Sequence, residues 1–378
     1  MRNLPAHRAT SERRRVHQFL YSLGFRDAVG THTLEMDRVF RRAGIRGAVW
    51  AEDIHPRMLR QARPADGYQG SLAARRSKNV FVYQASTGSR RIVNELLLSR
   101  REPTTIYYHN ITPARFFEPW APSDALNLAW GREELNLLAP RIRVAMANSE
   151  FSADELRALG IADVRVIPPY LPPTRDVPPN PDHARWLRTT KRGIDILSVS
   201  RIVPHKGHLH LIRAFAALRA AVDGNARLFL VGAWGPDEYM RALFRLRERL
   251  GLEGVVFTGS IAESTLAAHY READVYLSLS EHEGFGLPLV EAMRHWVPVV
   301  AYDGGAVAET LGGSGVLLDT LDPTIVAEVV GRVSADAAMR EQLIHGQLAR
   351  VSALESFPRD KLILDAVIDA ARQAVSTG

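Results

Sequence analysis

The chain has 378 residues, which is enough for two domains, and its composition of 46% hydrophobic and 24% charged residues is typical of soluble globular proteins. It contains no cysteine, which excludes disulfides, thiolate metal sites and a cysteine nucleophile. No apolar run approaches the roughly 18–20 residues of a membrane span. The Arg-rich start lacks the apolar core of a secretory signal. We therefore expect a cytoplasmic protein.

The formal net charge is +6, and the excess is uneven. Residues 1–30 carry six arginines against two acidic residues, and residues 56–100 carry nine basic residues against two acidic ones. A basic first half favours phosphates, nucleic acid or an anionic membrane face as partners. The alternative is an Arg-rich surface that reflects only the composition of the genome.

The first half of the chain alternates between strand and helix patterns. Residues 33–43 predict an amphipathic helix that ends before Gly44, and a second helix runs from a cap at Ser149 or Ser152 to Gly160. Short apolar strands are predicted at 47–51, 79–84, 104–109, 144–149 and 164–169.

A proline-rich segment then separates this half from a second one. Residues 171–183 hold five prolines and no periodicity, which predicts an extended linker. Strands are predicted beyond it at 195–199, 228–231, 255–258, 275–279, 297–301 and 315–318. Helices are predicted at 207–222, 236–250, 263–271, 288–295, 305–311 and 359–375.

This alternation predicts an α/β protein with two Rossmann-like domains, whose parallel sheets face each other across a cleft. The expected boundaries are 1–172 and 173–356, and a C-terminal helix at about 357–378 is expected to pack back on the first domain. Ligands of open parallel sheets bind outside the carboxyl ends of the strands. We therefore examine the residues that follow each strand.

Two cations follow the strand at 195–199. Arg201 and Lys206 lie five residues apart in a short loop that opens a helix. A guanidinium, an ammonium and a helix N-terminus together suit a diphosphate. The alternative is that both cations are solvated surface residues.

The loop after the strand at 275–279 combines carboxylates with glycines, whose backbone N–H groups are accessible to a ligand. Gly284 and Gly286 flank Phe285, and Glu283 and Glu291 lie on either side of them. A carboxylate can accept hydrogen bonds from two hydroxyls of a sugar or ribose. Glu291, expected in the first turn of the next helix, can instead simply complement the helix dipole. The helix dipole explains Glu283 poorly, because this residue lies between a buried strand and a glycine.

Further candidates carry weaker signals. Gly232 and Ser260 lie in turns after two strands, where backbone can approach a ligand or simply change direction. His109 ends the strand at 104–108 and can hydrogen-bond a sugar, shuttle a proton, or play a structural role. Gly30 precedes the first helix and can admit a phosphate.

The second half resembles the nucleotide-sugar domain of retaining GT-B glycosyltransferases of family 4. The motifs that carry the resemblance, in family order, are "SRIVPHKGH", "LFLVGAWG", "VVFTGSI", "SEHEGFGLPLVEAM" and "VAYDGGAVAETLGGSGVLLD". In the first half, "TTIYYHNITPARFF" and "VAMANSEFSADEL" resemble the acceptor domain of bacterial family-4 enzymes of polysaccharide biosynthesis, several of them mannosyltransferases.

The resemblance implies a role for each candidate residue. Arg201 and Lys206 would hold the donor diphosphate, and Glu291 the ribose diol. Glu283 would hold the transferred sugar, with His109 near it. The other substrate-binding positions that the resemblance implies are Gly30, Gly232, Ser260, Gly284, Phe285, Gly286 and Leu287.

The resemblance also implies a reaction without a metal ion or other cofactor. The expected partners are an NDP-sugar donor such as GDP-mannose or a UDP-hexose, and a saccharide, small-molecule or lipid-linked acceptor. We expect no nucleic-acid partner. Peripheral contact with an anionic membrane is a further expectation. Two departures from the family pattern are Arg294-His295-Trp296, where small residues are usual, and Ser200, where glycine is common.

Two other functions fit parts of the pattern. One is a GT-B-fold epimerase that acts on a nucleotide sugar without an acceptor. The other is a basic protein that binds membrane or nucleic acid and whose nucleotide-sugar domain is a catalytically inactive remnant. The presence of Arg201, Lys206, Glu283 and Glu291 together favours a glycosyltransferase over both.

Overall fold

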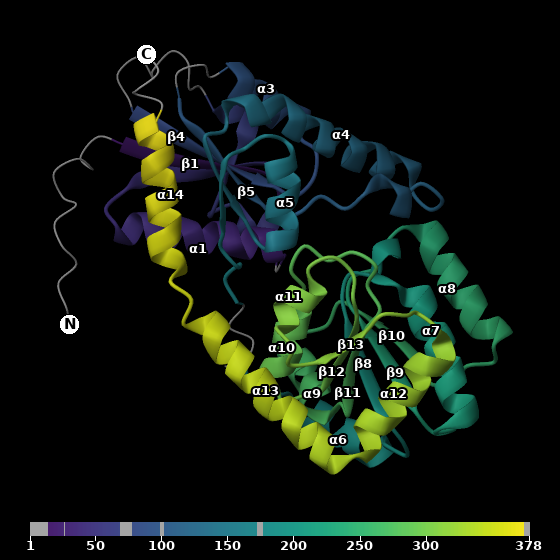
Figure 1. The fold of residues 1–378 in the computed structure, drawn as a ribbon. Helices are drawn as coiled ribbons and strands as arrows, with labels where there is room; N and C mark the ends of the chain where they lie inside the picture. Colours follow the sequence, from purple (N-terminus) through teal and green to yellow (C-terminus); the bar gives the residue numbers. More distant parts are fainter. Residues whose placement is uncertain (1–13, 26, 69–77, 99–101, 172–176, 374–378) are drawn as a thin grey trace. The chain divides into compact units, whose positions relative to one another are not determined.

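A computed structural model describes residues 14–25, 27–68, 78–98, 102–171 and 177–373. The chain divides into two compact units (Figure 1). Unit 1 comprises Met1–Pro113, Leu126–Tyr170 and Pro358–Gly378, and unit 2 comprises Ala114–Ala125 and Leu171–Phe357. In the described part of the chain, no helix is long and apolar enough to cross a bilayer.

Unit 1 is built on a parallel sheet whose described strands follow the order β3-β2-β1-β4-β5-β6-β7. The strands are β1 (Arg14–Leu23), β2 (Arg46–Ile54), β3 (Arg63–Pro64), β4 (Lys78–Ala85), β5 (Thr104–Tyr108), β6 (Val144–Ala147) and β7 (Asp163–Val166). The helices are α1 (Ala28–Arg42), α3 (Arg90–Leu98), α5 (Glu150–Ala158), α14 (Arg359–Gln373) and most of α4 (Pro122–Leu138). The last helix, α14, packs against strands β4, β5 and β6 and against α1, near which it lies in Figure 1.

The strand β1 is an interior strand of this sheet, between β2 and β4, yet it is not among the strands predicted from the sequence. Its apolar run is interrupted by His17 and Gln18, and both are buried. Each has a buried hydrogen-bond partner: Trp50 Nε1 of β2 donates to His17 Nδ1 at 3.1 Å, and Gln18 Nε2 donates to the Thr33 carbonyl of α1 at 3.0 Å. Paired in this way, the two polar side chains are tolerated in the core.

Unit 2 contains a second parallel sheet, with its described strands in the order β10-β9-β8-β11-β12-β13. The strands are β8 (Asp195–Val199), β9 (Arg227–Val231), β10 (Val255–Gly259), β11 (Val275–Ser278), β12 (Val299–Tyr302) and β13 (Val316–Leu318). The helices are α6 (Pro181–Thr190), α7 (His208–Ala221), α8 (Asp237–Arg249), α9 (Glu263–Glu272), α10 (Leu287–Arg294), α11 (Val307–Leu311), α12 (Pro323–Ala335) and α13 (Ala337–Glu355).

Each strand predicted from the sequence is present, with ends that differ by a few residues. Three local predictions need correction. The first helix begins at Ala28, because Asp27 caps it by accepting from the Gly30 amide. Ser149 caps α5, and Ser152 lies inside that helix. The expected linker ends early, because Asn180 caps α6 and accepts from two amides of its first turn. Residues 172–176 of that segment lie outside the described residues.

The segment Ala114–Ala125, which the sequence analysis leaves in the first domain, groups with unit 2. Aromatic contacts account for this grouping. The Phe117 ring lies 5.8 Å from the His205 ring, and Trp120 meets Tyr239 edge to face at 5.1 Å. The pattern of strands and helices along the chain does not predict contacts between rings so far apart in the sequence.

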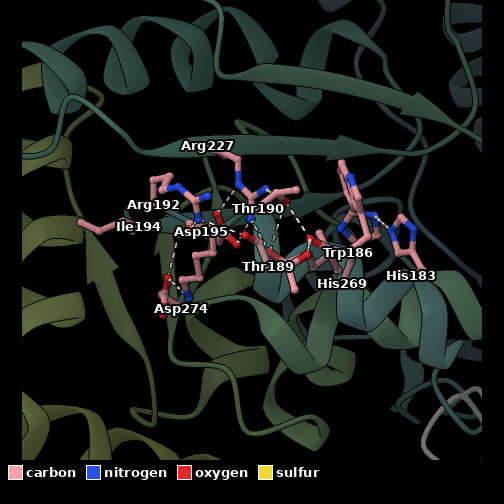
Figure 2. Close-up of polar contacts among 12 residues, drawn as sticks. His183, Trp186, Thr189, Thr190, Arg192, Ile194, Asp195, Arg227, His269 and Asp274 are labelled. Atoms are coloured by element: carbon pink, nitrogen blue, oxygen red, sulfur yellow. Dashed lines mark hydrogen bonds and ion pairs between the residues drawn. The ribbon is translucent and has the colours of Figure 1, made fainter.

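Charged residues gather where β8, β9 and β11 begin, at the amino edge of the unit 2 sheet (Figure 2). Arg227 donates to both carboxylate oxygens of Asp195, at 2.7 and 2.6 Å, and to Thr190 Oγ1 at 2.7 Å. The Asp195 amide donates to Asp274 at 2.8 Å, and Lys191 lies 2.6 Å from the same Asp274 oxygen. This cluster joins α6 to three strands.

We predict that Arg227→Ala strongly destabilises the protein. The Asp195 side chain is only 3% exposed, so the change leaves a buried carboxylate without its bidentate partner. Breaking one side of a buried ion pair costs about 3–5 kcal/mol of unfolding free energy, which urea denaturation measures. Arg241→Ala, which breaks an exposed pair with Glu238 on one helix, is the control and should change little. An Arg227 variant as stable as the control would contradict the prediction.

Candidate functional site

Opposite charges meet at the carboxyl edge of the unit 2 sheet. Lys206 lies between β8 and α7, and Glu283 lies between β11 and α10. Lys206 Nζ donates to Glu283 Oε1 at 2.6 Å, and the side chains are only 18% and 10% exposed. The structure thus places two of the predicted residues in direct contact, although they are far apart in the chain.

Glycines allow the loops at this edge to pass close to one another. Gly207 has φ of +69°, and a Cβ there would lie 1.9 Å from the Leu279 carbonyl oxygen. A Cβ on Gly304 would lie 2.1 Å from the Ser280 carbonyl oxygen. Gly305, also at φ of +69°, pairs with Glu283 through an isolated parallel bridge. Any side chain at these positions would force the loops apart.

A small pocket opens beside Glu283, with about 230 Å³ of empty space that is partly open to solvent. Three serines at or just after strand ends, Ser200, Ser278 and Ser280, contribute to its wall. The Oγ atoms of Ser278 and Ser280 are 3.2 Å apart. The pocket therefore offers hydroxyls next to a carboxylate. None of the three serines was predicted as a site residue, because serine at a strand end has no distinctive sequence pattern.

The loop Gly284–Leu287 joins this pocket to α10. Phe285 is buried, and its carbonyl accepts a hydrogen bond from the Thr310 hydroxyl. Gly286 caps α10 with φ of +90°, a conformation that favours glycine. The predicted group of Gly284, Phe285, Gly286 and Leu287 therefore lies in one turn beside Glu283.

Glu291 lies in the second turn of α10, not in the first as the sequence analysis expects, because the helix begins at Leu287. The correction removes the simple dipole explanation for this carboxylate. Glu291 is buried, and Tyr270 donates from its hydroxyl to Oε2 at 2.9 Å. The Tyr270 ring stacks on His295 with a centroid distance of 5.0 Å. Burial raises the pKa of Glu291 to about 7, against the lowering effect of the Tyr270 hydrogen bond.

The remaining unit 2 candidates lie at the same edge of the sheet. Arg201 and Ser260 are exposed in the loops after β8 and β10. Gly232 follows β9 with φ of +151°, and a Cβ there would lie 1.9 Å from the Ser200 carbonyl oxygen. Among the described residues, no group of three or more His, Cys, Asp or Glu side chains is arranged to hold a metal ion.

The two unit 1 candidates differ in what they can offer a ligand. His109 follows β5, and its Nε2 lies 2.8 Å from Gln84 Oε1. Burial lowers the pKa of His109 to about 3, so the ring is neutral at pH 7 and suits hydrogen bonding better than proton transfer. The Gly30 amide donates to Asp27 Oδ1 at 2.5 Å. A phosphate at Gly30 would therefore have to replace the helix cap.

We predict that Glu291→Gln stabilises the protein above pH 7 and changes little near pH 5. A carboxyl whose pKa is 4.5 when unfolded and about 7 when folded is favoured in its protonated form by folding. Its contribution to the free energy of unfolding is complete below pH 4.5 and falls as pH rises through 7, by about 3 kcal/mol in total. Urea denaturation at pH 5 and pH 8 measures the difference.

The matched control for this prediction is Glu248→Gln, because Glu248 is exposed on α8. Its difference from the wild type should be the same at both pH values. The explanation fails if Glu291→Gln is no more stabilising at pH 8 than at pH 5.

Known proteins resemble this chain in sequence and in fold. Residues 182–347 match the family model of glycosyl transferases group 1. A GDP-mannose-dependent alpha-(1-6)-phosphatidylinositol monomannoside mannosyltransferase of Mycolicibacterium smegmatis is 36% identical over 184 residues, 44% of this chain and 47% of the relative. A D-inositol 3-phosphate glycosyltransferase of Jonesia denitrificans is 32% identical over 215 residues, 53% of this chain and 51% of the relative. The chain thus spans about half the length of these curated relatives.

The similarity in fold extends over nearly the whole chain. The crystal structure of Anabaena HepE in complex with UDP-glucose superposes with a TM-score of 0.71 at 20% identity and covers 96% of this chain and 98% of the other. Both units take part in that match, although the family model covers unit 2 residues only. The chain therefore has the GT-B fold, and its residues 182–347 match the family model of glycosyl transferases group 1.

Proposed function

We propose that this protein is a retaining glycosyltransferase of family 4, which moves a hexose from a nucleoside diphosphate sugar to a saccharide or lipid-linked acceptor. The observation that carries the proposal is the Lys206–Glu283 contact at the carboxyl edge of the unit 2 sheet. A cation for a diphosphate and a carboxylate for a sugar are needed side by side, because the two parts of the donor are joined by one bond.

The residues around this contact supply the rest of a donor site. Lys206 and Arg201 bind the diphosphate, and the start of α7 adds main-chain donors. Glu283 and the turn Gly284–Leu287 bind the sugar, and Glu291 binds the ribose diol through its carboxylate. Gly232 and Ser260 line the nucleoside, while Gly30 and His109 of unit 1 contact the phosphates and the sugar.

The names of the relatives support mannose as the transferred sugar. The Mycolicibacterium smegmatis relative is a GDP-mannose-dependent mannosyltransferase. The structurally similar HepE is in complex with UDP-glucose. We therefore favour GDP-mannose and keep UDP-hexoses as the alternative donors.

The chemical step breaks the bond from sugar C1 to the diphosphate oxygen and forms a bond from C1 to an acceptor oxygen. The acceptor hydroxyl attacks from the face that the diphosphate leaves, and its proton passes to a phosphate oxygen. Charge grows on the diphosphate as it leaves. Arg201, Lys206 and the helix N-terminus stabilise that charge without a metal ion. Product analysis tests the reaction: an epimerised donor with no new glycoside would overturn it.

We predict that Lys206→Ala weakens binding of the donor by about 10–100-fold, because a charged hydrogen bond to phosphate is lost. Thermal shifts with GDP-, UDP- and ADP-sugars identify the donor, because tight binding raises the melting temperature. Titration calorimetry then compares variants. Lys206→Arg keeps the charge and should retain more affinity. Lys361→Ala, on the exposed face of α14, is the control. Unchanged affinity in Lys206→Ala would refute the diphosphate role.

The same calorimetry tests Glu291 at pH 8, where its carboxylate form is favoured. The wild type should bind the ribonucleoside diphosphate about tenfold more tightly than its 2′-deoxy form, and Glu291→Gln should lose most of that preference. A variant that keeps the full preference would show that another residue binds the ribose.

We also propose that the basic first half contacts the anionic face of the cytoplasmic membrane, where a lipid-linked acceptor would be presented. The basic residues on which this proposal rests lie in residues 1–30 and 56–100, and those at 1–13, 26, 69–77 and 99–101 lie outside the described residues. Co-sedimentation with vesicles should increase with anionic lipid content and decrease with added salt. Binding that is insensitive to anionic lipid would contradict the proposal.

A further inference from the structure

A line of side-chain hydrogen bonds runs through the sheet of unit 1, from α1 to the end of β5. Gln18 on β1 and Gln84 on β4 are each 1% exposed. Gln18 Nε2 donates to the Thr33 carbonyl at 3.0 Å, and Gln84 Nε2 donates to Gln18 Oε1 at 2.8 Å. Gln84 Oε1 then meets His109 Nε2 at 2.8 Å. A backbone carbonyl at one end is thus connected to an imidazole at the other.

The direction of this line follows from chemistry alone. The Thr33 carbonyl can only accept, so Gln18 must turn its NH₂ toward it and its oxygen toward Gln84. Gln84 must then turn its NH₂ toward Gln18 and its oxygen toward His109. The thioether of Met36, 3.2 Å from Gln84 Nε2, also lacks a hydrogen to donate and requires the same orientation. Reversing either amide would bring two acceptors face to face.

The orientation of Gln84 decides the protonation of His109. An imidazole nitrogen that faces a carbonyl oxygen must carry the hydrogen. We propose that Gln84, anchored through Gln18 to the Thr33 carbonyl, holds His109 as the Nε2–H tautomer, so that Nδ1 accepts a hydrogen bond from a hydroxyl of the bound sugar. Gln18 and Gln84 are therefore positioning residues for His109.

The surroundings of His109 are consistent with that role. Its amide donates to the Ala85 carbonyl at 2.9 Å, and its carbonyl accepts from Asn148 Nδ2 at 3.0 Å. The Tyr107 and His32 rings lie 4.7 and 5.3 Å away. Within the described residues, Nδ1 makes no hydrogen bond. It is also not one of the buried polar atoms there that lack both solvent contact and a hydrogen-bond partner. Burial holds the pKa of His109 at about 3, so the ring is neutral at pH 7 and carries one N–H, which the Gln84 contact assigns to Nε2.

The first test reads the tautomer directly. The intact chain is labelled with ¹⁵N-histidine, and His109 is assigned from the signal that is absent in H109Q. We expect a protonated Nε2, an unprotonated Nδ1 and no titration between pH 5 and 8. In Gln84→Leu the two nitrogen shifts should move toward each other as the tautomers mix, with a smaller effect in Gln18→Leu. The second variant serves if the first fails to fold. A protonated Nδ1, or an unchanged signal in both variants, would overturn the proposal.

The second test uses two substitutions that each keep one end of the ring. An asparagine amide atom takes the place of Nδ1, whereas a glutamine amide atom takes the place of Nε2. The readout is the gain in affinity from GDP to GDP-mannose, and from UDP to UDP-glucose. His109→Asn should keep most of that gain in affinity. In His109→Gln the gain should be about tenfold smaller than in the wild type. Equal losses, or the reverse order, would exclude Nδ1 as the acceptor.

This inference rests on the proposed function where it assigns the hydroxyl to a donor sugar, and the two tests separate the two ideas. If neither sugar nucleotide binds more tightly than its nucleoside diphosphate, the assignment to these donor sugars fails. The histidine spectra still report whether the relay holds His109 as the Nε2–H tautomer. If the spectra contradict the relay while the sugars bind, the proposed function stands and the positioning role of Gln84 is wrong.

Discussion

The close passage of backbone against backbone at the carboxyl edge of the unit 2 sheet is the constraint on which the site depends. Gly207 lies against the Leu279 carbonyl, and Gly304 against the Ser280 carbonyl, at distances that leave no room for a Cβ. These contacts bring the loops after β8, β11 and β12 together. Lys206 can reach Glu283 because of them, and the pocket forms beside that pair. The ion pair is thus a consequence of loop packing.

The two edges of the same sheet serve opposite purposes. At the amino edge, Arg227 and Asp195 form a bidentate pair that satisfies both charges and joins secondary-structure elements. At the carboxyl edge, Glu291 is buried with a raised pKa, and it lowers the stability of the fold when ionised. A structure keeps an unfavourable carboxylate at a site where a ligand needs it. Burial raises the pKa of Asp195 as well, but Asp195 has the Arg227 guanidinium as a bidentate partner, whereas Glu291 accepts a hydrogen bond from the neutral Tyr270 hydroxyl.

Much of the unit 2 site was predictable because its residues follow strands directly, and strand ends of a parallel sheet share one edge. Lys206 and Glu283 were expected at that edge for this reason. The position of Glu291 in the second turn of α10 was not, because it depends on Gly286 ending the loop with positive φ. The strand β1 was also missed, since His17 and Gln18 interrupt its apolar run and their partners lie elsewhere in the chain.

The sequence by itself determined the alternation of strands and helices, the Gly-rich loops and the order of the motifs, because each is encoded within a few neighbouring residues. Only the tertiary structure decided which polar groups meet. The amide of Gln18 lies 66 residues from that of Gln84, and together they settle the protonation of His109. The aromatic residues of Ala114–Ala125 join unit 2 in the same way, through contacts with distant rings. Local patterns specify elements, but a hydrogen bond between distant side chains requires the packed sheet.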